Sequence, residues 1–158
     1  MTLAPQLLVA AVIALAGSAA GAAAAQGTDT TMAADNPFAH PSTLPFELPP
    51  FDRIHDSDYL PAFAAGMRAQ LAEVAAIAHD PQPPSFDNTI VALERAGQLL
   101  DRVRRTFSNL NSCNTDPQMQ RIDTEMAPRL AAHEDAIFLD PDLWKRVDTL
   151  YNLSLIHI

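Results

Sequence analysis

Apolar side chains recur every three or four residues along most of the chain beyond residue 57, which is the spacing of one face of an α-helix. The segment 58–79 shows this pattern, with Phe63, Met67, Leu71, Val74 and Ala78 on a single face. Asp58 is suited to cap such a helix, and Pro61 is tolerated in its first turn. We therefore predict a helix from about residue 58 to about residue 79.

Three further helices are predicted, each with its own start signal. After the proline-rich break at 81–84, a second helix begins around Ser85 to Asn88 and runs to about Leu110. Asp-Pro pairs at 116–117 and 140–141 open a third and a fourth helix, because Asp caps a helix and Pro fits its first turn. Their apolar stripes are Ile90, Leu93, Gly97, Leu100, Phe107 and Leu110, then Met119, Ile122, Met126, Leu130, His133 and Ile137, and finally Leu143, Val147 and Leu150. Pro128 is expected to bend the third helix. No hairpin signal or repeat is present, so the predicted fold class is all-α.

The segment 36–57 reads as an extended strap rather than a helix. Five prolines lie between Asn36 and Asp58, and proline prevents helix formation there. The apolar side chains available to anchor the strap are Phe38, Leu44, Phe46, Leu48 and Phe51. Because exposing all of them would be costly, we expect the strap to lie across a helical body larger than this chain.

The first 25 residues have the pattern of a secretory signal peptide. No charged side chain precedes Asp29, and an apolar block at 7–16 is followed by small residues up to Ala25. Cleavage after Ala25 leaves Gln26 as the mature N-terminus, and the A-G-A at 20–22 is an alternative cleavage signal. A retained membrane anchor is the competing interpretation, although Ala and Gly in the second half insert weakly. Residues 26–35 are then expected to form a polar tether.

Composition bounds the function. The chain of 158 residues is 48% hydrophobic and 18% charged, enough for one domain core. Its net charge of −9 disfavours nucleic acid as a partner. The basic residues Arg102, Arg104 and Arg105 are interpreted as solvated charges on a helix.

Candidate chemistry is sparse. Cys113 is the single cysteine and is expected to be a small buried apolar side chain. His133-Glu134 begins the H-E-x-x-H pattern of zinc hydrolases, but Ile137 stands where the second histidine is needed, so His133 is expected to be a partly buried helix residue. The other histidines, His40, His55, His79 and His157, lack ligand spacing. The carboxylate pairs Asp56 with Asp58 and Glu134 with Asp135 are interpreted as helix-end residues.

Several strings resemble the opening of the thimet oligopeptidase family of zinc metallopeptidases. They are N-P-F at 36–38, P-P-F-D-R-I at 49–54, D-Y-L-P-A-F at 58–63, P-S-F-D-N-T-I-V-A-L-E at 84–94 and A-P-R-L-A-A-H at 127–133. The similarity is greatest to the peptidyl-dipeptidase branch and extends from about Asn36 to Tyr151.

The resemblance implies that residues 58–152, with the strap, are N-terminal helices from one lobe of a larger two-lobed helical metallopeptidase. Such an enzyme releases C-terminal dipeptides from oligopeptides with a zinc-activated water. The leader at 1–25 adds the expectation that the enzyme is exported to the periplasm. The family's zinc-binding helix lies downstream of the matched region, so no catalytic, cofactor-binding or metal-binding residue is assigned to this chain. We expect the 158 residues alone to bind no zinc and to be inactive.

The last six residues and the alternative function give two further expectations. Residues 153–158 are apolar and look like translated sequencing-adapter DNA, so they are suspected to be a non-native tail. The alternative function is a non-catalytic periplasmic module of helices that binds peptides without cleaving them. In neither case is stable membrane insertion expected after signal cleavage.

Overall fold

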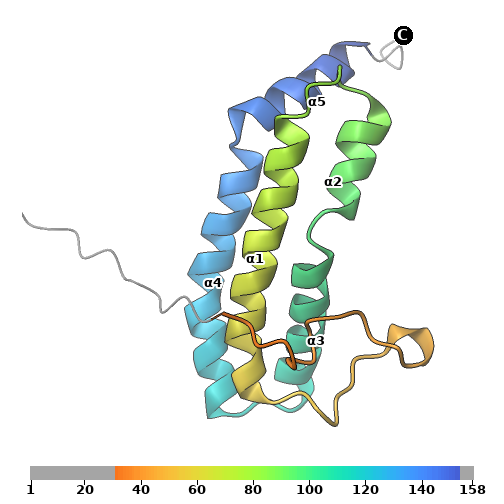
Figure 1. Cartoon of the computed structure of the whole chain (residues 1–158). Coiled ribbons are helices and arrows are strands. Elements are labelled where there is room, and N and C mark those ends of the chain that lie inside the picture. The colour runs from red at the N-terminus through yellow and green to blue at the C-terminus, as the bar shows by residue number, and fades with distance from the viewer. Residues whose placement is uncertain (1–30, 154–158) are drawn as a thin grey trace, which may run out of the picture.

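The computed structural model describes residues 31–153, and these confirm the predicted all-α class. The elements in chain order are η1 (Pro45–Glu47), α1 (Asp56–Ala78), η2 (Phe86–Val91), α2 (Ala92–Arg95), α3 (Gln98–Cys113), α4 (Pro117–Phe138) and α5 (Pro141–Leu153). No strand occurs within 31–153. In Figure 1, α1 runs between α4 on one side and α2 with α3 on the other, and α5 crosses one end of the bundle.

The helix starts follow the capping signals in the sequence. At α4, the Asp116 carboxylate accepts hydrogen bonds from the backbone N–H groups of Gln118 and Met119, at 2.6 and 2.9 Å. Asp140 caps α5 in the same way through Asp142 and Leu143. These bonds satisfy N–H groups that have no partner inside the helix. Both Asp-Pro starts are therefore confirmed.

An aromatic cluster forms the main core. The rings of Phe38 and Tyr59 lie 5.4 Å apart between centroids, and Tyr59 and Phe63 each meet Phe107 edge to face, at 5.0 and 5.5 Å. Met126 of α4 is buried in the same cluster. Edge-to-face pairs add about 0.5–1.5 kcal/mol beyond the area they bury. Burial of Tyr59 raises the pKa of its hydroxyl to about 12. This cluster joins the strap to α1, α3 and α4.

The backbones of α1 and α3 approach each other closely at Gly66. A Cβ placed on Gly66 would lie 2.9 Å from the Cα of Leu100 and 3.0 Å from its backbone nitrogen. Real Cβ atoms do not come so near to a neighbouring backbone. Only glycine therefore permits this spacing of the two helices.

The predicted continuous second helix is wrong, because the chain turns at Ala96 and Gly97. Ala96 is extended (ψ 147°), and Gly97 adopts the left-handed conformation (φ 79°). The Gly97 N–H donates to the Glu73 carboxylate at 2.7 Å, and the Gln70 side chain occupies the space beside Gly97. The break separates the π-helical η2 and the short α2 from α3. Contacts with α1 thus override the apolar periodicity.

The strap is anchored by fewer residues than predicted. Phe38 is buried and accepts a hydrogen bond from the Arg102 guanidinium to its backbone oxygen at 3.0 Å. The other four predicted anchors, Leu44, Phe46, Leu48 and Phe51, are exposed. Hydrogen bonds and the burial of Phe38 hold the N-terminal part of the strap against the bundle. The segment around η1 projects from the bundle (Figure 1).

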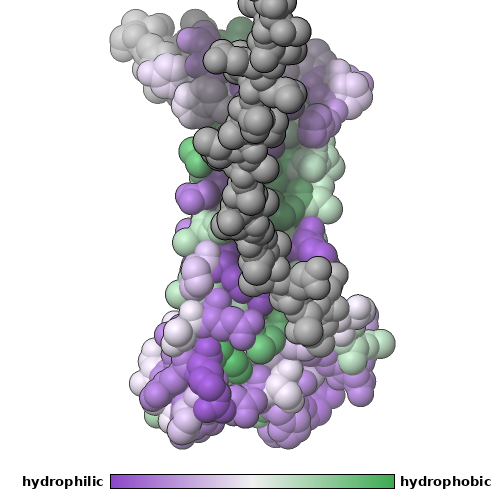
Figure 2. All heavy atoms as spheres, turned by 90° about the vertical axis from the view of Figure 1, so that its left-hand side faces the viewer, coloured by the Kyte–Doolittle hydropathy of each residue, from purple (hydrophilic) through white to green (hydrophobic). Residues whose placement is uncertain are grey.

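A second, smaller core lies at the α5 end of the bundle. Val74, Ile77 and Ala78 of α1 meet Ile137 of α4 and Leu143 of α5 there. Seen from the side of α4, hydrophilic residues dominate the lower part of the surface, and hydrophobic residues gather at mid-height (Figure 2).

The leader at 1–25, most of the tether and the tail beyond Leu153 lie outside the described residues. Within 31–153, none of the helices is both long enough and apolar enough to cross a membrane. The predictions for signal peptide, tether and tail therefore remain predictions.

The close approach of α1 and α3 at Gly66 can be tested by substitution. Gly66→Ala is expected to lower the free energy of unfolding by about 1–3 kcal/mol, because the methyl group forces α1 and α3 apart. The measurement is urea unfolding followed by circular dichroism. Ala76→Gly, at an exposed position of α1, measures the helix-propensity difference alone, about 1 kcal/mol. Stabilisation by Gly66→Ala, as propensity alone dictates, would show that the spacing of α1 and α3 is not constrained.

Candidate functional site

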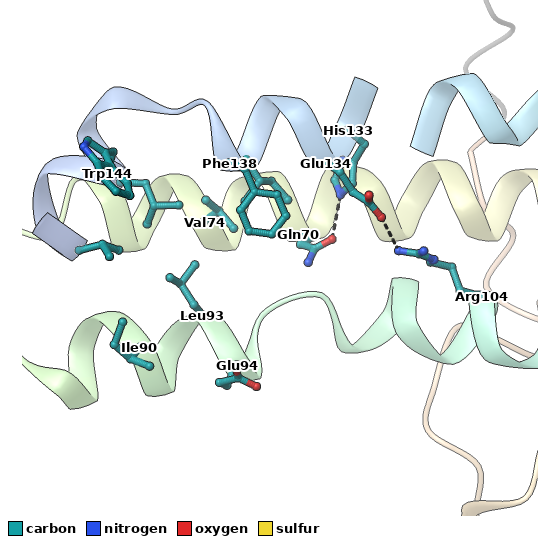
Figure 3. A pocket seen from close by; sticks show the side chains of 13 residues that line it. Gln70, Val74, Ile90, Leu93, Glu94, Arg104, His133, Glu134, Phe138 and Trp144 are labelled. Atoms are coloured by element: carbon teal, nitrogen blue, oxygen red, sulfur yellow. Dashed lines mark hydrogen bonds and ion pairs between the residues drawn. The ribbon is translucent and has the colours of Figure 1, made fainter. Parts of the chain in front are cut away.

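A groove of about 580 Å³ lies between the helices of the described part of the chain. Figure 3 shows α1 and α4 along one side and η2 with α2 along the other. Its lining residues are Gln70, Val74, Ile90, Leu93, Glu94, Arg104, His133, Glu134, Ile137, Phe138, Leu143, Trp144 and Val147. The break at Gly97 shapes this groove, because it sets α2 apart from the line of α3 (Figure 1).

One end of the groove is polar, and its polar groups are paired with one another. His133 Nε2 lies 2.8 Å from Gln70 Oε1, so the ring nitrogen donates to the amide oxygen. Arg104 donates to the Glu134 carboxylate at 2.9 Å (Figure 3). Because both partners of the ion pair are about half exposed, water screens it and it adds little stability. Glu134 and Arg104 together carry no net charge.

His133 is buried, as its position on the apolar stripe predicted. Burial lowers the pKa of the imidazole below 6.5, with Arg104 adding to the effect and Glu134 opposing it. Its Nδ1 has no hydrogen-bond partner among residues 31–153. In the neutral ring this nitrogen is an acceptor, since Nε2 donates to Gln70. His133 is therefore a neutral packing residue that links α4 to α1.

The opposite end of the groove is apolar and open. Phe138 is 77% exposed and Trp144 is 64% exposed, and Leu139, next to Phe138, is 77% exposed. Val74, Ile90 and Leu93 form the walls below these rings. Contiguous exposed apolar side chains of this kind mark a surface that another molecule or segment covers.

The described residues do not fit a zinc site. Zinc in hydrolases takes histidine and carboxylate ligands that converge on one point. Within 31–153 no three His, Cys, Asp or Glu side chains converge in this way. His133 is turned to Gln70 and Glu134 to Arg104, so the H-E pair does not form a ligand set. His40, His55 and His79 lie apart on the strap, at the start of α1 and at its end, and His157 lies outside the described residues.

Two sequence interpretations of single residues require correction. Cys113 was predicted to be buried, but it is exposed in the last turn of α3. Cys113 is the last residue of α3, at the end of the bundle, and its thiol donates to the Asn109 carbonyl at 3.0 Å. Arg102 was interpreted as a solvated charge, but it binds the strap at Phe38. Arg104 and Arg105 do form surface ion pairs, with Glu134 and Asp101.

The acidic pair at the start of α1 divides into two roles. Asp58 was predicted to cap the helix, but α1 begins at Asp56 with His55 as its N-cap residue. Asp58 is the third residue of the helix and accepts a hydrogen bond from the His55 N–H at 2.8 Å, which completes a capping box. Asp56 instead shares a hydrogen bond with Asp116 at the start of α4, and burial together with this bond raises the pKa of Asp56. The hydrogen bond between Asp56 and Asp116 joins the starts of α1 and α4, at the end of the bundle opposite α5 (Figure 1).

The family-like strings prove to be structural joints. In N-P-F, the Asn36 side chain accepts from the Phe38 N–H at 2.9 Å and donates to the Asp58 carbonyl at 3.1 Å. The first string is thereby fastened to the third, D-Y-L-P-A-F, whose Tyr59 packs on Phe38. These residues fix where the strap crosses α1.

The P-S-F-D-N-T string forms a second joint around Asn88. Ser85 and Asn88 cap each other's backbone N–H groups, at 3.1 and 2.8 Å. The buried Arg146 of α5 donates to the Asn88 amide oxygen at 3.0 Å and to the carbonyls of Asp80 and Gln82. Sequence analysis overlooked Arg146, although its position three residues after Leu143 placed it beside the apolar stripe of its helix. It connects α5 to the turn before η2.

Comparison with known proteins confirms the family resemblance. The chain is 44% identical to dipeptidyl carboxypeptidase of Escherichia coli (strain K12) over 122 residues, which are 77% of this chain and 18% of that protein. It is 40% identical to dipeptidyl carboxypeptidase of Salmonella typhimurium over 116 residues, 73% of this chain and 17% of that protein.

A more distant relative is oligopeptidase A of Escherichia coli (strain K12), 24% identical over 106 residues, which are 67% of this chain and 16% of that protein. No family model matches the chain. The chain thus spans less than a fifth of the length of the curated relatives it matches.

The buried His133 predicts a pH dependence of stability. The unfolded chain binds a proton at this residue as the pH falls through about 6.5, whereas the folded chain resists it, so unfolding becomes easier on acidification. His133→Gln is expected to reduce the loss of unfolding free energy between pH 7.5 and pH 5.5, measured by urea titration at each pH. His40→Gln, on the exposed strap, is the control and should leave the loss unchanged. Equal pH dependence in His133→Gln and the natural chain would contradict the account of the buried imidazole.

Proposed function

Because the chain is related to the peptidyl-dipeptidase branch of the thimet oligopeptidase family, we propose that it is the N-terminal part of an exported, zinc-dependent peptidyl-dipeptidase. The observation that carries this proposal is the 44% identity to a dipeptidyl carboxypeptidase over 77% of the chain. The enzyme's action would be hydrolysis of oligopeptides with release of C-terminal dipeptides, and its substrates would be oligopeptides.

The role proposed for the described helices is structural. Their family-like residues form joints between the strap, α1, α3 and the start of η2, with side-chain polar groups used in those joints. The zinc ligands and the general base would come from parts of the larger enzyme outside this chain. We propose that these helices belong to a wall of the substrate channel, which admits oligopeptides and keeps folded proteins out.

The proposal includes inactivity of the 158 residues by themselves. The described part offers no converging ligand set for zinc, and Glu134, the one carboxylate beside a histidine in the groove, is held by Arg104. A zinc hydrolase needs the metal to generate its nucleophile at neutral pH. Peptide binding without cleavage, the alternative function, has the groove as its candidate site.

Activity can be tested with the 158-residue chain and a chimera. In the chimera, residues of this chain replace the matching segment of Escherichia coli dipeptidyl carboxypeptidase. Each protein is incubated with zinc and an N-acylated tetrapeptide, and dipeptide release is followed by liquid chromatography and mass spectrometry. We expect no release by the 158-residue chain, release by the chimera, and loss of release when zinc is chelated.

Each outcome decides one part of the proposal. Dipeptide release by the 158-residue chain alone would contradict its proposed inactivity. A folded chimera that releases no dipeptide would contradict the proposed contribution of this segment to a peptidyl-dipeptidase. Retention of the tetrapeptide by the 158-residue chain, without cleavage, would favour the peptide-binding alternative.

Export is tested by the mass of the mature protein. After expression in a Gram-negative host, the periplasmic protein is expected to begin at Gln26, and the intact mass reveals the N-terminus. Ala23→Lys with Ala25→Lys should abolish cleavage at that site, because signal peptidase requires small residues there. A full-length mass in the membrane fraction would instead identify the leader as an anchor.

A further inference from the structure

The open apolar end of the groove lacks a covering element among residues 31–153. Phe138 and Trp144 present their rings on its rim, on α4 and α5, and both are more than half exposed. Burial of apolar surface stabilises a protein by about 25 cal/mol per Å². A segment that covers the two rings and the aliphatic side chains beneath them would therefore gain a substantial free energy of burial.

The shape of the groove suits a helix. Its long sides are helical, α4 with α5 on one side and η2 with α2 on the other, and Val74 of α1 lies at its floor. Helices pack against one another with axes about 8–10 Å apart, through side chains that fit between the ridges of their neighbours. A further helix that lies over α1, between α4 and α2, would pack in this way.

The chemistry of the groove also distinguishes a helix from an extended peptide. An extended peptide brings unpaired backbone N–H and C=O groups that must find partners when buried. Four polar side chains of the groove are already paired, Gln70 with His133 and Arg104 with Glu134, and Glu94 on α2 is a further polar residue of the lining. A helix satisfies its own backbone and needs only apolar contacts.

We propose that the groove seats an amphipathic helix of the same polypeptide, from the portion of a relative-sized protein that this chain does not span. This inference rests on the proposed function, in which these helices are part of a longer peptidase. The chain spans only 18% of its relative's length, so most of such a polypeptide is available to supply the helix. The seated face should carry apolar residues at helical spacing, and it needs no charge opposite the neutral Arg104–Glu134 pair.

Cysteine labelling tests the proposal. Phe138→Cys is introduced on a Cys113→Ser background, both in the 158-residue chain and in the chimera with Escherichia coli dipeptidyl carboxypeptidase. The rate of maleimide labelling at residue 138 is followed by peptide mass spectrometry. We expect labelling to be at least about tenfold slower in the chimera, because a seated helix must leave before the thiol reacts.

Two further variants serve as replicate and control. Trp144→Cys, on α5 along the same side of the groove, should be protected in the chimera like residue 138. Asp123→Cys replaces an exposed, charged side chain of α4 that does not line the groove. Its labelling rate should be the same in both proteins.

The outcomes separate this inference from the proposed function. Equal labelling at residue 138 in both proteins overturns the seated helix even if the chimera releases dipeptides. Protection without dipeptide release supports the seated helix and counts against the enzymatic role. Protection that rises with the concentration of the 158-residue chain, or that requires added oligopeptide, assigns the groove to a second copy or to a peptide and overturns the proposal. A chimera that fails to fold also counts against it, because the groove should accept the relative's helix.

Discussion

The close approach of α1 and α3 at Gly66 is the constraint on which the rest of the structure depends. With the two backbones in contact at Leu100, the ring of Phe107 reaches Tyr59 and Phe63, and this aromatic cluster receives the strap through Phe38. Between α2 and α3 the chain turns at Gly97, beside the Glu73 and Gln70 side chains of α1. That turn separates α2 from α3 and shapes the groove. Helix spacing, strap position and groove shape thus all depend on packing against α1.

The residues that reveal the family are positioned for folding rather than for chemistry. Asn36 fastens the strap to the start of α1, and Asn88 receives Arg146 of α5 at the start of η2. Both side chains accept through the amide oxygen and donate through the amide nitrogen, and so fix backbone segments that have no regular secondary structure. A relationship to peptidases can therefore rest on residues that fasten the fold. The role proposed for the segment is structural and rests on the elements that it holds together.

Local chemistry made much of the fold predictable, and long-range contacts explain the rest. The Asp-Pro starts of α4 and α5 and the buried stripe of α4 follow from capping and periodicity, which act within a few residues. The turn at Gly97 depends on Glu73 and Gln70, more than twenty residues away, so the apolar periodicity of the sequence does not predict it. Exposure of Phe46 and Cys113 likewise depends on where the bundle ends. The groove was unpredictable for the same reason, since it arises from that turn.

Sequencing of the genomic locus across the codons for residues 151–158, and several hundred codons beyond, tests whether these helices open a longer peptidase. The account predicts an open reading frame that departs from the present 153–158 sequence and continues into a helix with the H-E-x-x-H zinc motif. A natural stop codon directly after Ile158 would contradict the assignment to a peptidyl-dipeptidase. The helices would then have to act by binding alone.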